Sequence, residues 1–223
     1  MNIRFVSNMD TGWMKSDKTL YIDVHHKLLP FSQVLDLFRR IDAEFDVLKY
    51  CNGFNAGGRF IFQILSQEFI EELAGIINNS IEDSRGKGPI LEIMGGDGKL
   101  SEFLRPRVHG ELIATDSKRD AHDIAYPKWV IKEDAMDAVR RFTPAIALMS
   151  WEPLLSSVGY DIVEMGLPLI WIGDPEYCAA ESGLLRMHHE RTRSRYALGR
   201  RDDFSSDEFR TDIYLFNWFS HDR

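Results

Sequence analysis

The chain has 223 residues, of which 44% are hydrophobic and 12% aromatic, enough to bury the core of one large domain or of a domain with an appendage. Its formal net charge of -8 argues against a protein that holds duplex nucleic acid by bulk electrostatic attraction. No apolar run approaches the length of a membrane span and residues 1–10 lack the pattern of a signal peptide, so we expect a soluble, cytoplasmic or otherwise intracellular protein without membrane contact.

Apolar residues at helical spacing predict helices in the first part of the chain. One helix is expected over residues 31–48, and a second has its apolar stripe over residues 69–77 and is expected to end at Asn78-Asn-Ser80, because apolar residues recur in both at spacings of three and four. Ser32 is the expected N-cap of the first helix. A glycine-rich break between the two helices includes Gly57-Gly58-Arg59, a candidate lid over a ligand. Residues 1–85 are therefore expected to form a mostly helical extension that packs on the core.

From residue 86 onward, short apolar segments alternate with helical ones, which is typical of a parallel sheet covered by helices. The expected strands are residues 90–94, 111–115, 129–132, 145–150 and 167–172, and the expected helices are residues 99–104, 135–141 and 157–165. A last strand over residues 214–219 is expected to be antiparallel, at or near an edge. The predicted fold class of residues 86–223 is α/β, a Rossmann-like three-layer sandwich with a mostly parallel sheet.

The first of these strands runs through a glycine cluster directly into a helix, in the segment Glu92-Ile-Met-Gly-Gly-Asp-Gly98. Glycines at such a turn let the backbone approach a ligand without a Cβ clash. In an open parallel sheet, ligands bind beyond the carboxyl ends of the strands, so the residues that follow each strand are expected to lie together. The order of apolar strand, acidic residue, glycine turn and helix is typical of a nucleotide-type cofactor site.

Four strand ends supply the candidate site residues. They are Glu92, Gly95, Gly96 and Gly98 at the first strand, Asp116 and Ser117 at the second, Glu133, Asp134 and Ala135 at the third, and Ser150, Trp151, Glu152 and Pro153 at the fourth. Asp116 ends an apolar run where a carboxylate could hold ribose hydroxyls. Each carboxylate also has a structural alternative, because Glu92 and Asp116 could be solvated strand ends and Asp134 could cap the next helix.

The glycine segment resembles the first motif of the class I S-adenosylmethionine-dependent methyltransferases, an acidic residue followed by Gly-x-Gly-x-Gly, except that Met94 stands where the first glycine is usual. The resemblance covers residues 89–174. It implies S-adenosylmethionine as the cofactor, with an acidic residue near the methionine moiety, one at the ribose and one near the adenine amino group. Carried onto this sequence, the implied cofactor-binding residues are Glu92, Gly95, Gly96, Gly98, Asp116, Ser117, Asp134 and Ala135.

The segment Ser150-Trp-Glu-Pro153 loosely resembles a short Asn/Asp/Ser-Pro-Pro-aromatic loop that many amino-methylating members carry at this position. This resemblance favours a nitrogen acceptor. With such an acceptor, Ser150 and the carbonyl near Trp151 are the candidates for orienting the lone pair, Trp151 for stacking on a planar acceptor, and Glu152, from its position alone, for acting as a base or neutralising a cationic acceptor. Alternatively, Ser150 forms the turn and the other two side chains pack. Together with residues 50–72 and 171–174, this loop resembles small, poorly characterised methyltransferase-like proteins.

Three functional hypotheses follow. The first is an S-adenosylmethionine-dependent methyltransferase that acts on an unknown acceptor. The second is a catalytically inactive methyltransferase-like binding or scaffold protein, motivated by Met94 and by the loose fourth motif. The third is an NAD(P)-dependent oxidoreductase, but its fingerprint needs a third glycine where this chain has Ser101.

The remaining chemical features have simpler interpretations. Cys51 and Cys178 lack metal-ligand spacing and are expected to be ordinary buried thiols rather than a disulfide. The histidine pairs at residues 25–26 and 188–189 are sequence neighbours that point in different directions, so no metal site is expected. The tract from Arg186 to Arg201 is strongly basic and is a candidate for contact with phosphates of a nucleic acid or nucleotide, with a solvated face as the alternative.

Overall fold

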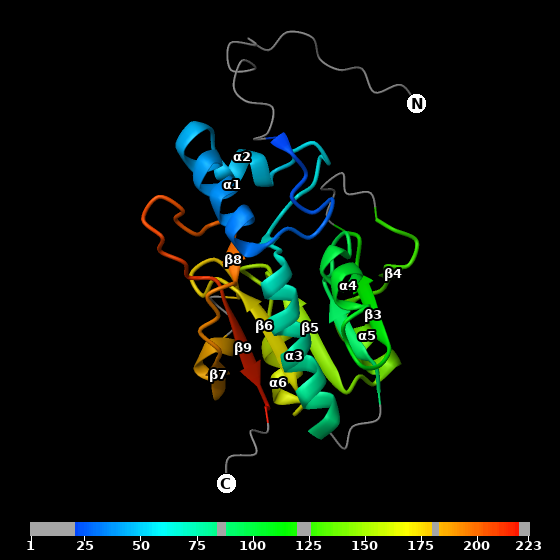
Figure 1. Cartoon of the computed structure of the whole chain (residues 1–223). Helices are drawn as coiled ribbons and strands as arrows, with labels where there is room; N and C mark the ends of the chain where they lie inside the picture. Colours follow the sequence, from blue (N-terminus) through cyan, green and yellow to red (C-terminus); the bar gives the residue numbers. More distant parts are fainter. Residues whose placement is uncertain (1–20, 84–87, 120–125, 180–182, 219–223) are drawn as a thin grey trace.

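A computed structural model describes residues 21–83, 88–119, 126–179 and 183–218, and Figure 1 shows the order of the elements. The start of the predicted extension, residues 84–87 of the loop before the first core strand, and Phe219 of the last predicted strand lie outside the described residues. The helices are α1 (Phe31–Glu44), α2 (Val47–Cys51), α3 (Gln67–Asp83), α4 (Lys99–Leu104), α5 (Ala135–Phe142), α6 (Val158–Glu164) and the short 3-10 helix Leu184–Arg186. The strands are β1 (Gln63–Ile64), β2 (Ile90–Ile93), β3 (Leu112–Asp116), β4 (Ile131–Lys132), β5 (Ile146–Ser150), β6 (Leu169–Gly173), β7 (His189–Arg191), β8 (Leu198–Gly199) and β9 (Asp212–Phe216).

The main sheet has seven strands in the order β4-β3-β2-β5-β6-β9-β7. The five strands from β4 to β6 are parallel, whereas β9 runs antiparallel to β6 and to β7. The order along the chain reverses between β2 and β5, so the topological switch point lies there, and open sheets of this kind bind ligands at that point. The chain therefore has a Rossmann-like α/β fold, as the alternating pattern predicts.

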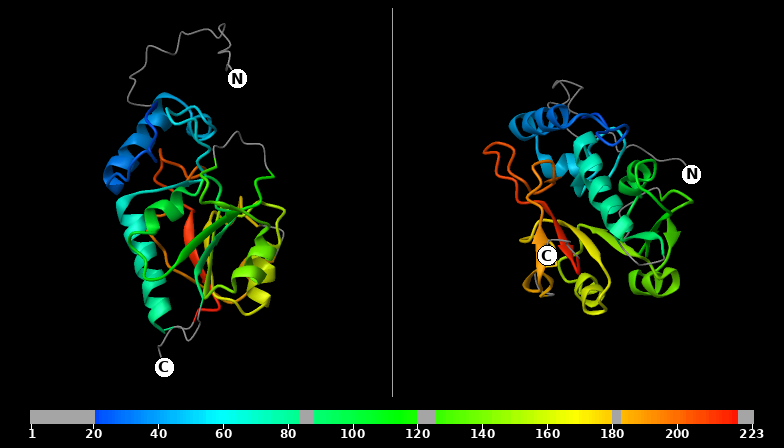
Figure 2. Two further views of the ribbon diagram at one scale, coloured as in Figure 1. Left: turned by 90° about the vertical axis from the view of Figure 1, so that its right-hand side faces the viewer. Right: turned by 60° about the horizontal axis from the view of Figure 1, so that its bottom comes forward.

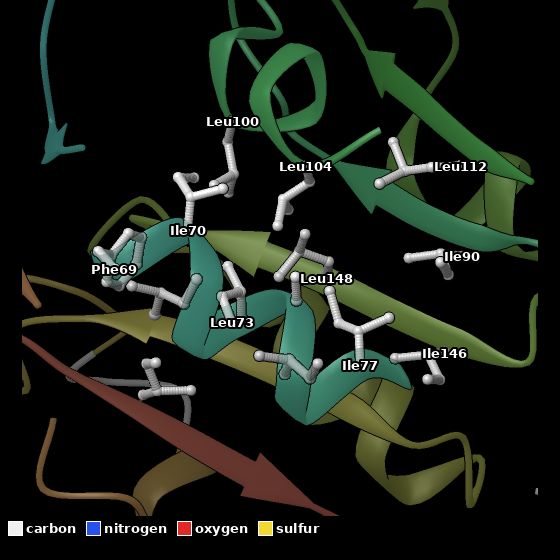
Figure 3. Packing of buried hydrophobic residues seen from close by; sticks show 14 of the residues in the cluster. Phe69, Ile70, Leu73, Ile77, Ile90, Leu100, Leu104, Leu112, Ile146 and Leu148 are labelled. Carbon is white, nitrogen blue, oxygen red and sulfur yellow. The ribbon is translucent and has the colours of Figure 1, made fainter. Parts of the chain in front are cut away.

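Helices cover both faces of the sheet, which gives the three layers visible in Figure 2. Successive residues of a strand point to opposite faces, so Ile146 and Leu148 of β5 pack with α3 and α4, whereas Ala147 and Met149 pack with α5 and α6. Figure 3 shows the first of these layers, in which Leu73 and Ile77 of α3 lie over the sheet. Because both faces are covered, the strands read as nearly continuous apolar runs.

The N-terminal part contributes a third apolar cluster and a second, two-stranded sheet. Helices α1 and α2 pack around the buried rings of Phe38 and Tyr50, and Figure 1 shows them beyond the end of the main sheet from which β9 starts. Strand β1 pairs antiparallel with β8, so residues far apart in the sequence are joined there. Helix α3 packs on the main sheet itself and continues to Asp83, past the end predicted at residues 78–80. The domain boundary near residue 85 stays a prediction.

The sequence patterns place most core elements within a few residues. The predicted helix over residues 99–104 is confirmed, α5 begins as predicted, and the five parallel strands are all present. The last strand is antiparallel and second from the edge, which confirms its predicted direction. The third strand is shorter than predicted, since Trp129 and Val130 precede β4. None of the described helices is both long and apolar enough to cross a membrane.

Two predictions about the first helix are wrong. Instead of one helix over residues 31–48, α1 ends at Glu44 and α2 begins at Val47, because the Asp46 side chain accepts a hydrogen bond from the Lys49 N–H at 2.8 Å and starts a new helix. Ser32 is not the N-cap, because the helix starts at Phe31, two residues earlier than that cap implies, and Pro30 occupies the N-cap position. The Phe31 N–H is satisfied instead by the Glu68 carboxylate at 2.6 Å.

The two cysteines are free and buried, as the sequence predicts. Burial disfavours the thiolate and raises the pKa of both Cys51 and Cys178 to about 12. Neither thiol is therefore activated as a nucleophile near neutral pH.

Candidate functional site

The turn between β2 and α4 has a left-handed backbone at three positions. The φ angles are 54° at Met94, 54° at Gly96 and 75° at Gly98. These alternate positions are those of the three glycines in the Gly-x-Gly-x-Gly pattern, so the chain keeps the turn although Met94 has a side chain. Non-glycine residues adopt this conformation at a cost of about 1 to 2 kcal/mol. The partly buried Met94 side chain packs against the apolar cluster that contains α5 and α6.

The glycines of this turn have different surroundings. A Cβ added at Gly98 would lie 2.5 Å from the Trp129 ring, and one added at Gly95 would lie 3.0 Å from the Glu92 carboxyl carbon. A Cβ added at Gly96 would meet no atom within 4 Å. Gly95 and Gly98 are thus required by close packing inside the protein, whereas Gly96 faces open space in which a ligand can approach the backbone.

Glu92 lies beneath the turn and is only 2% exposed. Its Oε2 accepts a hydrogen bond from the Ser101 hydroxyl on α4. Burial raises the pKa of Glu92 to about 7, although the bond from Ser101 opposes this shift. Ser101 occupies the position where a dinucleotide fingerprint has its third glycine, and its hydroxyl serves the buried carboxyl instead. This contact weakens the oxidoreductase hypothesis.

Asp116 ends β3 beside the turn. Its Oδ2 accepts a hydrogen bond from the Gly96 N–H at 3.0 Å, and its Oδ1 accepts one from the Lys118 N–H at 2.6 Å. Each carboxylate oxygen can accept a further hydrogen bond, so Asp116 keeps capacity for two ligand hydroxyls. Ser117, the next residue, is partly exposed. The structure therefore brings Asp116 and the open side of Gly96 together.

Asp134 and Ala135 lie next to this carboxylate. The Glu133 N–H donates to the Asp116 carbonyl oxygen at 3.1 Å, which fixes the end of β4 against the end of β3. The Asp134 Oδ1 caps α5 by accepting a hydrogen bond from the Met136 N–H at 3.1 Å, and its Oδ2 lies 3.5 Å from the Arg119 guanidinium. Asp134 is thus a helix cap, which was the structural alternative, and it also lies at the edge of the candidate site.

The end of β5 presents a hydroxyl and an indole. Within the described part of the chain, the buried Ser150 Oγ has no hydrogen-bond partner. Trp151 has a left-handed backbone with a φ of 58°, and its Nε1–H donates to the Gln63 Oε1 at 3.1 Å. This bond fixes the orientation of the Gln63 amide, because the opposite orientation would place two donors together. The Gln63 Nε2, also buried, has no partner among the described residues.

Glu152 points away from Ser150 into the core. It is 1% exposed, and its carboxylate accepts hydrogen bonds from the Gly159 N–H at 2.9 Å and from the Trp171 Nε1–H at 3.0 Å. Burial raises its pKa, although these hydrogen bonds oppose the shift. The arrangement ties the loop after β5 to α6 and β6, and it favours a structural role for Glu152 over a role as a base.

A short segment from the N-terminal part lies across the switch point. Arg59 contacts the turn after β2, because its Nη1 lies 2.5 Å from the Asp97 Oδ2 while its Nε binds the Asp23 Oδ2 at 2.8 Å. Four residues later, Gln63 binds Trp151 after β5. Residues 59–63 therefore bridge the two strand ends between which the sheet order reverses.

Sequence reasoning named Arg59 as part of a candidate lid but missed its partners. Asp23 lies in no motif and Asp97 lies within the glycine segment, but neither position indicates Arg59 as its partner, so this pairing was not predictable. Gln63 was also missed, although it is the only polar residue in the run from Phe60 to Leu65, and a single polar side chain inside an apolar run indicates a buried, hydrogen-bonded group. Trp129, which covers Gly98, was interpreted only as part of a strand.

The fold is that of a Rossmann-like α/β protein, and the candidate ligand site lies at the carboxyl ends of β2, β3 and β4. No protein-family model and no curated protein sequence matches the chain. Solved structures that resemble it include a protein assigned as an O-methyltransferase from Klebsiella pneumoniae, 14% identical, covering 89% of this chain and 98% of that one with a TM-score of 0.44.

Two further similar structures are also methyltransferases by description. One is assigned as a SAM-dependent methyltransferase from Streptococcus mutans (14% identity, 63% of this chain, 47% of that one, TM-score 0.32), so the match spans about half the length of that protein. The other is the N-methyltransferase NodS from Bradyrhizobium japonicum (16% identity, 67% of this chain, 95% of that one, TM-score 0.33). At these similarities, function has to be inferred from the chain's own residues.

Alanine substitutions in the turn should separate internal packing from ligand space. Both variants place a side chain at a left-handed position, but only Gly98→Ala also adds a Cβ against the Trp129 ring. We therefore expect Gly98→Ala to lower the free energy of unfolding by about 2 kcal/mol more than Gly96→Ala does. Chemical denaturation of the two variants and the wild type measures this difference. Equal losses of stability would contradict the packing described for Gly98.

The raised pKa of Glu92 predicts a pH dependence of stability. The folded protein holds this proton more tightly than the unfolded chain, so Glu92 makes the wild type less stable as the pH rises from the ordinary value of 4.5 to about 7. Glu92→Gln removes this titration. The free energy of unfolding of the variant relative to the wild type should therefore rise by about 2 to 3 kcal/mol between pH 5 and pH 8.

The matched control is Glu71→Gln, which changes an exposed carboxylate on α3. We expect the stability difference between this control and the wild type to stay nearly constant over the same pH range. A constant difference for Glu92→Gln as well would mean that the Glu92 carboxyl is ionised in the folded protein throughout.

Proposed function

We propose that the chain binds S-adenosylmethionine at the carboxyl ends of β2, β3 and β4 and is a methyltransferase. The observation that carries the proposal is the open space over Gly96, bordered by a carboxylate with free acceptor capacity at Asp116. The left-handed backbone at Met94, Gly96 and Gly98 supports the match to the methyltransferase glycine motif, because the backbone conformation recurs at each glycine position of the motif.

The residues present fit this cofactor. Asp116 would accept hydrogen bonds from the ribose hydroxyls, with the backbone at Gly96 close beside them. Glu92 would lie near the methionine moiety, where a carboxyl with a pKa of about 7 can ionise in response to a nearby positive charge. Asp134, Ala135 and Ser117 would border the adenine end.

Methyl transfer needs geometry more than proton chemistry. S-adenosylmethionine bound at this site supplies a methyl group on a sulfonium, which is activated for in-line displacement. The protein can contribute by holding the acceptor in near-attack orientation and by excluding water. Residues 59–63 bridge the strand ends of β2 and β5 and are placed to limit access of water to the space between them.

We further propose that the atom that accepts the methyl group is a nitrogen. The Ser150 hydroxyl is buried and unpaired within the described residues, so it can accept an N–H of an amine or amide and thereby orient its lone pair. The Gln63 amide nitrogen, on the side chain that binds Trp151, offers two further donors. Trp151 is held by Gln63 and would form the wall of the acceptor space, whereas we assign Glu152 to the support of this loop.

Titration calorimetry tests the cofactor assignment. We expect S-adenosylmethionine and S-adenosylhomocysteine to bind the wild type and NAD to give no heat. Asp116→Ala removes a charged hydrogen-bond acceptor and should weaken both sulfur ligands about 10- to 100-fold. Asp116→Asn keeps an acceptor for the Gly96 N–H and separates ligand binding from folding, while Asp137→Ala on the exposed face of α5 is the matched control.

The outcomes discriminate between the hypotheses. Heat with NAD but with neither sulfur ligand would replace the methyltransferase with an oxidoreductase. Equal weakening by Asp116→Ala and Asp137→Ala would remove Asp116 from the site. Binding of the sulfur ligands without transfer of a labelled methyl group to pools of nucleic acid, protein or small molecules would favour the scaffold hypothesis.

A further inference from the structure

A second pocket, of about 510 Å³, lies between α1, β7 and the start of β9. It shares no residue with the candidate cofactor site, which lies on the other side of β5 and β6 in the sheet order. Its charged and polar lining consists of Arg39, Arg191, Arg193, Ser194, Arg195, Asp207, Thr211 and Asp212, and its apolar lining consists of Phe31, Leu35 and Phe209. Four arginines in one pocket are unusual for a chain whose net charge is -8.

Two of these arginines are neutralised by the carboxylates of the pocket. Arg39 binds Asp207 through two nitrogens, at 2.7 to 3.1 Å. The Arg191 Nε binds the Asp212 Oδ2 at 2.5 Å, and the Asp212 Oδ1 accepts the Ser194 N–H at 2.9 Å. Both carboxylates that line the pocket are therefore already paired with arginines.

The other two arginines leave positive charge in the pocket. Within the described part of the chain, neither Arg193 nor Arg195 forms an ion pair, and both side chains are exposed. Arg195 stacks on the Tyr196 ring at 4.8 Å and is attracted by Glu68 and Glu72 of α3. Arg193 has no such partner among the described residues, so its guanidinium is the group most available to an incoming anion.

The apolar residues of the pocket indicate which chemical group is attached to the anion that binds there. Phe31, Leu35 and Phe209 are half-buried and line the same pocket as the arginines, so part of the pocket wall is apolar. A guanidinium matches the geometry of phosphate oxygens and can bind two of them. A ligand with a phosphate at one end and an apolar or aromatic body at the other would satisfy both sides.

We propose that this pocket binds a small phosphomonoester with an apolar body, with Arg193 as the principal phosphate ligand and Leu35 in contact with the body. The proposal does not depend on the proposed methyltransferase activity. A nucleic acid fits less well, because the apolar lining has no counterpart in a phosphate backbone and the overall charge repels a polyanion.

Calorimetry with phenyl phosphate and inorganic phosphate tests the proposal. We expect the wild type to bind both and to bind phenyl phosphate more tightly. Arg193→Gln should weaken both about tenfold or more, whereas Leu35→Ser should weaken only phenyl phosphate. Arg140→Gln, which removes an exposed arginine of α5, is the control of equal charge and should change neither. The circular dichroism spectrum and the thermal unfolding midpoint of each variant serve as an independent check that it keeps its fold.

Several outcomes would overturn the proposal. Absence of saturable heat with both phosphates would remove the site. Equal weakening by Arg193→Gln and Arg140→Gln would mean that diffuse charge attracts the anion. Unchanged binding of phenyl phosphate in Leu35→Ser would remove the apolar half of the site. Tighter binding of a single-stranded oligonucleotide than of phenyl phosphate, lost in Arg193→Gln, would assign the arginines to nucleic acid.

Discussion

The buried carboxyl of Glu92 determines how the first core strand meets the helix that follows it. Ser101 of α4 donates to this carboxyl, so strand and helix are held at a fixed approach. The same carboxyl leaves little room for a side chain at Gly95, where an added Cβ would lie 3.0 Å from the Glu92 carboxyl carbon. The chain turns sharply here, with a left-handed backbone at Met94, Gly96 and Gly98. The buried polar contact therefore lies directly beneath the turn that faces the candidate ligand site.

Burial also gives this carboxyl a chemical property. A pKa of about 7 means that a change in nearby charge can alter its ionisation near neutral pH. A cationic ligand over the turn favours the ionised form, whereas a neutral or anionic ligand does not. Residues 59–63 complete the surroundings, since Arg59 holds Asp97 of the turn and Gln63 holds Trp151 across the switch point. The N-terminal part is therefore an integral part of the site.

Local sequence patterns were sufficient to predict the core helices and strands and the meeting of Asp116 with the glycine turn in the candidate site. Periodicity predicted α4 and the parallel strands, and the position of Asp116 after an apolar run predicted that it would meet the glycine turn. Those inferences work because a parallel sheet brings successive strand ends together. The split between α1 and α2 was missed because Asp46 competes locally as a cap within an otherwise continuous apolar period.

The contacts that close the site depend on long-range pairing and could not be predicted. Strands β1 and β8 have two residues each, too short for a period, and they join residues 63–64 to residues 198–199. The orientation of the Glu152 side chain could not be predicted either, because the loop after a strand can turn a carboxylate toward solvent or toward the core. Here the donors at Gly159 and Trp171 turn it inward.

A structure of the chain in complex with S-adenosylhomocysteine tests the proposed site most directly. We expect the ribose hydroxyls within hydrogen-bond distance of the Asp116 carboxylate, the ligand over the open side of Gly96, and its amino acid moiety on the side of Glu92. A ligand bound elsewhere, or no bound ligand at saturating concentration, would contradict the assignment of this turn as a cofactor site.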